Sequence, residues 1–142
     1  MIKLNNYINE AWSGVKKYTN NAEIEAWCEE MNMRNYTINS QGEIDVNGGV
    51  DLSFRAFTEL PYKFGKVNGW FVLSNNKKLK SLKNCPDEIS GYFDVDNCSA
   101  LESLEGCPKE VGGNFYCRKC KRKFTQKEVM TLCKLKKENI FV

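Results

Sequence analysis

The sequence predicts an α+β fold in which a short solenoid with a small parallel sheet is capped by N-terminal helices and a C-terminal helix. Three observations predict it: a motif that recurs every 22 residues, apolar residues at helical spacing near the N-terminus, and a helix-capping motif near the C-terminus. They divide the chain into an N-terminal helical cap (1–34), a solenoid (35–124) and a C-terminal capping helix (125–142). We expect one structural unit, because stacked repeats need covered ends.

The N-terminal cap is predicted as two helices. Apolar residues recur at i, i+3 and i+4 over about 3–18. Asn20 and Glu23 then form the pattern of a capping box, which predicts the start of a second helix. The apolar face of this second helix consists of Ile24, Trp27, Cys28 and Met31.

A hairpin is predicted where the solenoid begins. Tyr36–Asn39 and Glu43–Val46 flank the turn residues Ser40-Gln41-Gly42, a pattern typical of two antiparallel strands.

The solenoid is predicted from segments that align at a spacing of 22 residues. The aligned strand segments are Gly69-Trp70-Phe71-Val72-Leu73, Gly91-Tyr92-Phe93-Asp94-Val95 and Gly113-Asn114-Phe115-Tyr116-Cys117. Downstream positions recur at the same spacing: Leu79 and Leu82 as Leu101 and Leu104, and Cys85-Pro86 as Cys107-Pro108. In each strand the phenylalanine and the second residue after it point to one face, so stacked turns share an apolar core. The glycine before each strand allows either a positive φ or close packing.

The strand cores resemble the leucine-rich repeat family. The matching segments are Phe71-x-Leu73-x-x-Asn76, Phe93-x-Val95-x-x-Cys98 and Phe115-x-Cys117-x-x-Cys120. Over about residues 43–124, the unit is most similar to the short, irregular leucine-rich-repeat-like proteins of bacteriophages and prophages. The resemblance implies a solenoid with one strand in each turn, and it implies no activity.

The C-terminal cap is predicted as one helix over about 126–137. Thr125 and Glu128 form the pattern of a second capping box. The apolar face of the helix consists of Val129, Leu132 and Cys133.

Composition narrows the function classes. The 142 residues include seven cysteines and no histidine, which excludes histidine-based catalysis and histidine-containing metal sites. No apolar run approaches the roughly 20 residues of a membrane span, and the N-terminus carries no signal or transit peptide pattern. We therefore expect a cytoplasmic protein with reduced cysteines and no membrane partner.

The cysteines near the C-terminus raise the question of zinc. Cys117 and Cys120 have the spacing of a zinc knuckle, and Cys98 and Cys133 complete a set of four thiols. The repeat register favours the alternative, since these cysteines occupy positions that hold apolar residues or Asn in other turns. We predict buried core thiols, with no metal and no cofactor.

Catalysis is not expected. Asp94 and Asp96 lie on one strand face, about 7 Å apart by strand rise, which is a separation that glycoside hydrolases use. A flat strand face has no cleft, so we predict that the protein is not an enzyme.

Outward strand positions predict a binding surface. The partner-binding candidates are Trp70, Tyr92, Asp94, Asp96, Tyr116 and Arg118. Large amphipathic side chains on a regular surface are typical of protein interfaces, and the charged residues would add specificity. We therefore predict a protein-binding scaffold whose partner is a host or phage protein. The bacteriophage setting of the resemblance implies, by analogy, an anti-CRISPR-like inhibitor of a host defence system or of a host enzyme.

A nucleic-acid partner is the alternative. Residues 1–60 carry five Lys and Arg against nine Asp and Glu, whereas residues 117–142 carry nine against two. A basic C-terminal end suits an acidic partner, RNA or DNA. The candidate residues are Arg118, Lys119, Lys121, Arg122, Lys123 and Lys127.

Overall fold

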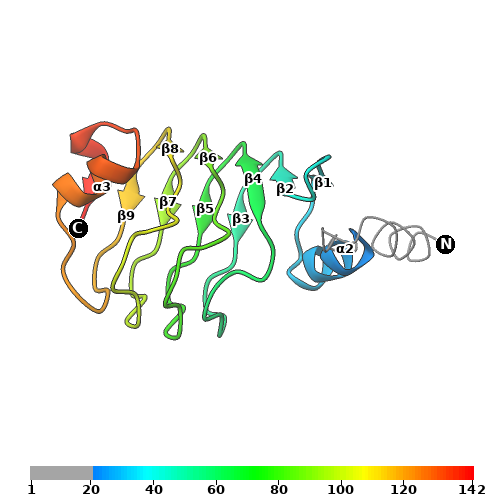
Figure 1. The fold of residues 1–142 in the computed structure, drawn as a ribbon, viewed down its shortest axis with the longest axis horizontal. Helices are drawn as coiled ribbons and strands as arrows, with labels where there is room; N and C mark the ends of the chain where they lie inside the picture. The colour runs from blue at the N-terminus through cyan, green and yellow to red at the C-terminus, as the bar shows by residue number, and fades with distance from the viewer. Residues whose placement is uncertain (1–20) are drawn as a thin grey trace, which may run out of the picture.

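The computed structural model describes residues 21–142 and has a mixed α/β fold (Figure 1). This part of the chain contains two α-helices and two five-stranded sheets. The helices are α2 (Asn21–Glu30) and α3 (Gln126–Leu132), and Lys137–Asn139 form the 3-10 helix η1. No helix within residues 21–142 has the length and apolar character needed to span a membrane.

The first sheet has the strand order β1-β2-β4-β6-β8, and only its β1–β2 pair is antiparallel. Its strands are β1 (Tyr36–Ile38), β2 (Ile44–Val46), β4 (Phe64–Val67), β6 (Glu88–Ile89) and β8 (Glu110–Val111). The second sheet has the order β10-β9-β7-β5-β3 and is parallel throughout. Its strands are β3 (Val50–Asp51), β5 (Phe71–Val72), β7 (Phe93–Asp94), β9 (Phe115–Tyr116) and β10 (Ile140–Phe141).

The 22-residue spacing of the sequence is the register of β5, β7 and β9 in the second sheet. Phe71 pairs with Phe93, and Phe93 pairs with Phe115. Backbone hydrogen bonds of 2.9 Å and 2.8 Å run from Phe71 N–H to the Tyr92 carbonyl and from Phe93 N–H to the Asn114 carbonyl. Successive turns of the chain therefore lie side by side, as Figure 1 shows from β3 to β9.

The part of the first sheet beyond the predicted hairpin was not expected, because within the repeats the sequence predicts strands only around the phenylalanines. Val67, Ile89 and Val111 nevertheless pair at the same spacing. When turns of equal length are stacked, every segment lies beside its counterpart in the next turn. Its backbone groups can then pair wherever both segments are extended, and buried backbone groups need such partners.

The core lies between the two sheets and is lined by the repeated apolar residues. Phe71, Phe93 and Phe115 are fully buried, and their rings contact one another in a row (centroids 6.3 Å and 5.0 Å apart). The predicted inward leucines are buried as well: Leu79, Leu82, Leu101 and Leu104. The inward direction of the phenylalanines is confirmed.

The glycines before the strands serve close packing and not a positive φ. A Cβ on Gly91 would lie 2.8 Å from the Gly69 backbone, and one on Gly113 would lie 2.9 Å from the Gly91 backbone. Of the two reasons that the sequence offers for these glycines, close packing is therefore correct.

At the N-terminal end, the second predicted helix is confirmed as α2. Its Ile24 and Cys28 are buried, and the Trp27 ring contacts Phe57, Tyr62 and Phe64. The predicted hairpin is confirmed as the antiparallel pair β1 and β2. The helix expected over 3–18 and the capping residue Asn20 lie outside the described residues.

At the C-terminal end, the Thr125–Glu128 capping box is confirmed, but the helix predicted over 126–137 ends at Leu132. Cys133 is extended, and the next residue pairs with β8: Lys134 N–H donates to the Lys109 carbonyl at 2.7 Å. Pairing with an exposed sheet edge thus replaces further helix. Leu132, predicted on the apolar face, is exposed, whereas Val129 and Cys133 are buried as expected.

A core substitution tests the shared interior. Phe93→Ala should lower the free energy of unfolding by about 3–5 kcal/mol, because the cavity would open between two other buried rings. Urea unfolding followed by circular dichroism measures the change. Met130→Ala, at an exposed position of α3, should cost less than about 1 kcal/mol. Equal losses for the two variants would contradict the placement of the core.

Candidate functional site

An aromatic row crosses the outward face of the second sheet. It consists of Trp70, Tyr92, Tyr116 and Phe141, which come from four successive turns of the chain. Neighbouring ring centroids lie 6.1 Å, 6.2 Å and 5.0 Å apart along the row. Trp70, Tyr92 and Phe141 remain 37–38% exposed. The row is continuous, partly exposed and attached to hydrogen-bonded backbone.

Trp70 begins the row because a glycine lies beneath it. The atoms nearest to the place where a Cβ would stand on Gly49 are three ring atoms of Trp70. The indole therefore lies across this glycine. The Tyr92 ring is stacked next to the indole and nearly parallel to it, with 15° between the two ring planes.

Phe141 is the member of the row that the sequence analysis missed. We expected a capping helix at the C-terminus, but Ile140 and Phe141 form β10 and pair in parallel with Phe115 and Tyr116. The signal in the sequence is the short apolar run Ile140-Phe141-Val142 at the end of a basic segment. Its strand nature depends on the free edge of β9, which single-sequence patterns do not show.

Asp94 lies within the row, on the strand position two residues after Tyr92 and beside Tyr116 of the next turn. Its Oδ1 accepts a hydrogen bond of 2.9 Å from Asp96 N–H. Burial raises the pKa of the Asp94 carboxyl above its ordinary value. Asp51, further along the same face, uses its Oδ1 in the same way, to accept from Ser53 N–H at 2.9 Å.

Asp96 and Arg118 form an internal pair. The Asp96 carboxylate is largely buried and accepts from Arg118 Nε at 2.9 Å and from Arg118 N–H at 2.6 Å. The Arg118 guanidinium also lies over the Tyr116 ring, 5.1 Å from its centroid. Asp96 was predicted as an exposed specificity residue, and this is wrong, because it is engaged inside the protein. The predicted pair of neighbouring carboxylates therefore has only one member without an ion pair in the described part of the chain, Asp94.

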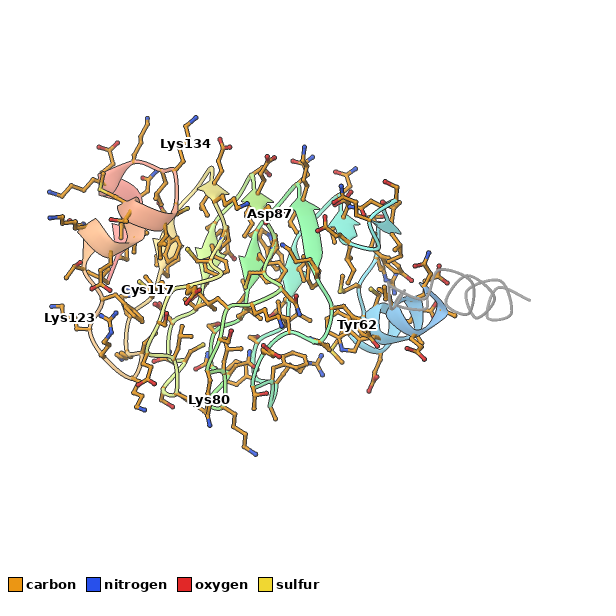
Figure 2. The ribbon with its side chains drawn as sticks, viewed as in Figure 1. Tyr62, Lys80, Asp87, Cys117, Lys123 and Lys134 are labelled. Carbon is orange, nitrogen blue, oxygen red and sulfur yellow. The ribbon has the colours of Figure 1, made fainter. Side chains whose placement is uncertain are left out.

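The predicted basic candidates gather at the C-terminal end, where Figure 2 shows Lys123 beside α3. Three of the six are neutralised locally by ion pairs: Arg118 with Asp96, Lys121 with Glu102, and Arg122 with Glu128. Lys119, Lys123 and Lys127 form no ion pair within residues 21–142.

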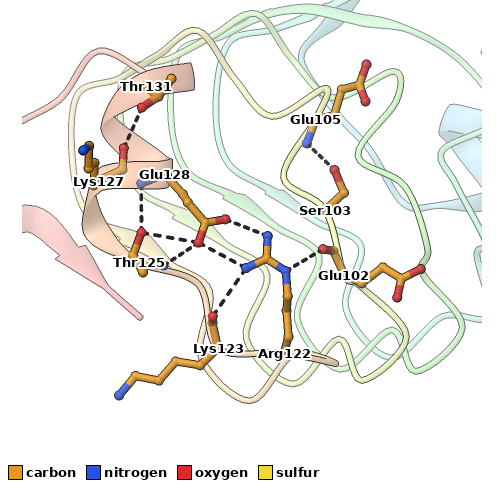
Figure 3. A network of polar contacts seen from close by, with 9 residues as sticks. All are labelled: Glu102, Ser103, Glu105, Arg122, Lys123, Thr125, Lys127, Glu128 and Thr131. Atoms are coloured by element: carbon orange, nitrogen blue, oxygen red, sulfur yellow. Dashed lines mark hydrogen bonds and ion pairs between the residues drawn. The ribbon is translucent and has the colours of Figure 1, made fainter.

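Arg122 is held in a network of polar contacts at the N-terminal end of α3 (Figure 3). Its guanidinium donates to both oxygens of Glu128, at 3.1 Å and 2.6 Å, and its Nε donates to the Glu102 carbonyl at 2.9 Å. The hydrogen bond from Arg122 lowers the pKa of the Glu128 carboxyl. Glu128 also completes the capping box of α3, so Arg122 has a structural role at this helix start.

The four cysteines considered for zinc fill the interior. Cys98, Cys117 and Cys133 are buried, Cys120 is partly buried, and Figure 2 shows Cys117 inside the fold. Cys98 and Cys120 donate through Sγ to backbone carbonyls of the preceding turn, those of Leu73 and Val95, at 3.3 Å and 3.5 Å. Asn76 makes the equivalent contact one turn earlier, at 2.9 Å. Within residues 21–142, no group of three or more Cys, Asp or Glu side chains is placed to hold a metal ion.

Comparison of the chain with known protein families, curated proteins and solved structures found no match.

The thiols should react slowly in the folded protein. Burial raises the pKa of Cys98, Cys107 and Cys117 to about 12, and that of Cys120 and Cys133 to about 11. Only the thiolate reacts, so labelling at pH 8 with a disulfide reagent should be more than about a hundredfold slower than in denaturant.

The pH dependence of the same reaction has a definite sign. Between pH 8 and 10 the labelling rate should keep rising, because every one of these thiols titrates above this range, whereas an exposed thiol levels off near pH 9. A thiol that labels at pH 8 as fast as free cysteine would contradict the burial described above.

Proposed function

We propose that the chain is a leucine-rich-repeat-like solenoid with helical caps at its ends, and that it acts as a non-enzymatic protein-binding scaffold. The binding surface is the aromatic row on the second sheet. The observation that carries the proposal is the continuity of Trp70, Tyr92, Tyr116 and Phe141 across four turns, with three of the rings more than one third exposed.

Two properties of the row support protein binding. Aromatic side chains provide large contact areas and lose little rotamer entropy on binding, so they dominate the energetics of many interfaces. The backbone beneath the row is fixed by parallel hydrogen bonds, for example from Leu73 N–H to the Asp94 carbonyl at 2.8 Å. A rigid surface avoids much of the ordering cost of association.

The resemblance to repeat proteins of bacteriophages supports a host protein as the partner. In that setting the scaffold would work in the cytoplasm and inhibit a host defence system or a host enzyme by occupying one of its surfaces. The phage setting comes from the resemblance alone.

Nucleic-acid binding is the second candidate, favoured by three lysines at the C-terminal end that lack an ion pair in the described residues: Lys119, Lys123 and Lys127. It is weaker than the first because Arg118, Lys121 and Arg122 are paired with carboxylates. Each pair removes one charge from phosphate binding, which depends on the number of phosphates neutralised.

Variants of the aromatic row separate the two candidates. Tagged wild-type protein and Trp70→Ala should be compared in a pull-down from the native host, with quantitative mass spectrometry of the captured proteins. Trp70→Ala should lose a specific partner, because truncation of an aromatic residue that anchors an interface weakens binding by about 2 kcal/mol or more. Gly49→Ala, which keeps the indole but displaces it, should weaken capture of the same partner.

The matched control is the double variant Lys123→Glu and Lys127→Glu. It should still capture the partner. Its only change should be elution from a polyanion column at a lower salt concentration. Loss of the partner in this control, with retention in Trp70→Ala, would contradict the proposal and favour nucleic acid. Circular dichroism confirms that each variant is folded.

A further inference from the structure

Asp94 is a partly buried carboxylate that forms no ion pair with the described residues, although the positive charge of Arg118 acts on it from the neighbouring turn. Arg118 contacts Asp96 and not Asp94, and no other ion pair within residues 21–142 includes Asp94. Its Oδ1 is used by Asp96 N–H, whereas Oδ2 accepts no hydrogen bond from the described residues. Removing a carboxylate from water is costly, and this burial raises the pKa of Asp94 even though the charge of Arg118 acts to lower it.

The surroundings of Asp94 are aromatic and acidic. Val72 and Tyr116 lie beside it on the neighbouring strands, and Tyr92 precedes it by two residues on the same face. Asp51 pairs with Val72 on the far side and adds a second carboxylate. A bound group that complements this part of the row would therefore carry a positive charge.

The protein contains an occupied version of this arrangement two residues further along the chain, at Asp96. Arg118 places its guanidinium on the Asp96 carboxylate and over the Tyr116 ring. Asp94 follows Tyr92 by two residues, and the Tyr92 ring stacks with that of Trp70. This segment therefore offers a carboxylate and exposed rings, but no guanidinium of residues 21–142 forms an ion pair with Asp94.

We propose that the Trp70–Tyr92–Asp94 segment of the aromatic row receives an arginine side chain presented by a protein partner. The inference rests on the proposed function and specifies the chemistry of the partner at this surface. The guanidinium would donate to Asp94 Oδ2 and lie on the exposed ring of Tyr92 or Trp70. Arginine suits the segment better than lysine, because a planar guanidinium stacks on aromatic rings while it donates in its plane.

Small probes test the proposal without knowledge of the partner. The full chain, labelled with nitrogen-15, is titrated with N-acetyl-arginine amide, N-acetyl-lysine amide and N-acetyl-glutamate amide, and amide and indole signals are followed by NMR. Trp70→Phe assigns the Trp70 indole signal. The arginine derivative should cause saturable shifts at Tyr92, Asp94 and the Trp70 indole at lower concentration than the lysine derivative, and the glutamate derivative should cause none.

Asp94→Asn is the decisive variant, because the amide oxygen still accepts from Asp96 N–H while the charge is lost. It should weaken binding of the arginine derivative by about tenfold or more, as expected for a charge-assisted hydrogen bond. Glu110→Gln, an exposed residue of β8 on the other sheet, removes the same charge and should leave binding unchanged.

Three results would overturn the proposal. The first is equal shifts from the arginine and glutamate derivatives, and the second is unchanged binding in Asp94→Asn. The third is displacement of the arginine derivative from the row by a single-stranded oligonucleotide, which would indicate stacking of bases in its place.

Failure of the arginine proposal can be distinguished from failure of the proposed scaffold function. A host partner that is lost with Trp70→Ala and retained with Asp94→Asn would leave the scaffold function standing and remove the arginine inference.

Discussion

Parallel pairing between residues 22 positions apart is the constraint on which the rest of the structure depends. It places Phe93 between Phe71 and Phe115 in the core, and it places Gly91 against the backbone of Gly69. The pairing also accepts a turn of 21 residues, because Val50 pairs with Phe71 and both side chains are buried. The register between neighbouring turns, which places inward residues beside inward residues, therefore aligns the core and the surface at once.

The aromatic row is the outward consequence of the same register. Each strand of the second sheet has only two residues with ladder pairing, yet the outward positions of adjacent turns come within ring contact of one another. The last member, Phe141, joins because β10 pairs with the free edge of β9. Gln126 of α3 donates to the Ile140 carbonyl at 3.2 Å, so the helix also engages this terminal strand. The end of the chain both extends the row and reduces the exposure of a sheet edge.

Charge in this protein is largely organised by local pairing. The basic C-terminal segment has the composition of a polyanion-binding tail, but Arg118 and Arg122 donate to Asp96 and Glu128 and help to order the last turns. Asp94 is the contrasting case, a partly buried acid that keeps one oxygen without a hydrogen bond from the described residues. A surface that combines exposed rings with such a carboxylate is chemically selective, since it favours cations and disfavours anions.

The sequence alone determined the repeat, the inward phenylalanines and leucines, the hairpin, the start of α3 and the outward direction of Trp70, Tyr92 and Tyr116, because these follow from spacing and local propensity. Three features were decided only by the tertiary structure. The second row of strands around Val67, Ile89 and Val111 forms because neighbouring turns offer partners for their backbones. Asp96 is withdrawn from the surface by Arg118, which lies 22 residues away in the chain. Cys133 and Phe141 are extended instead of helical because sheet edges lie beside them. In all three cases the deciding contact comes from a different turn, and no local pattern contains it.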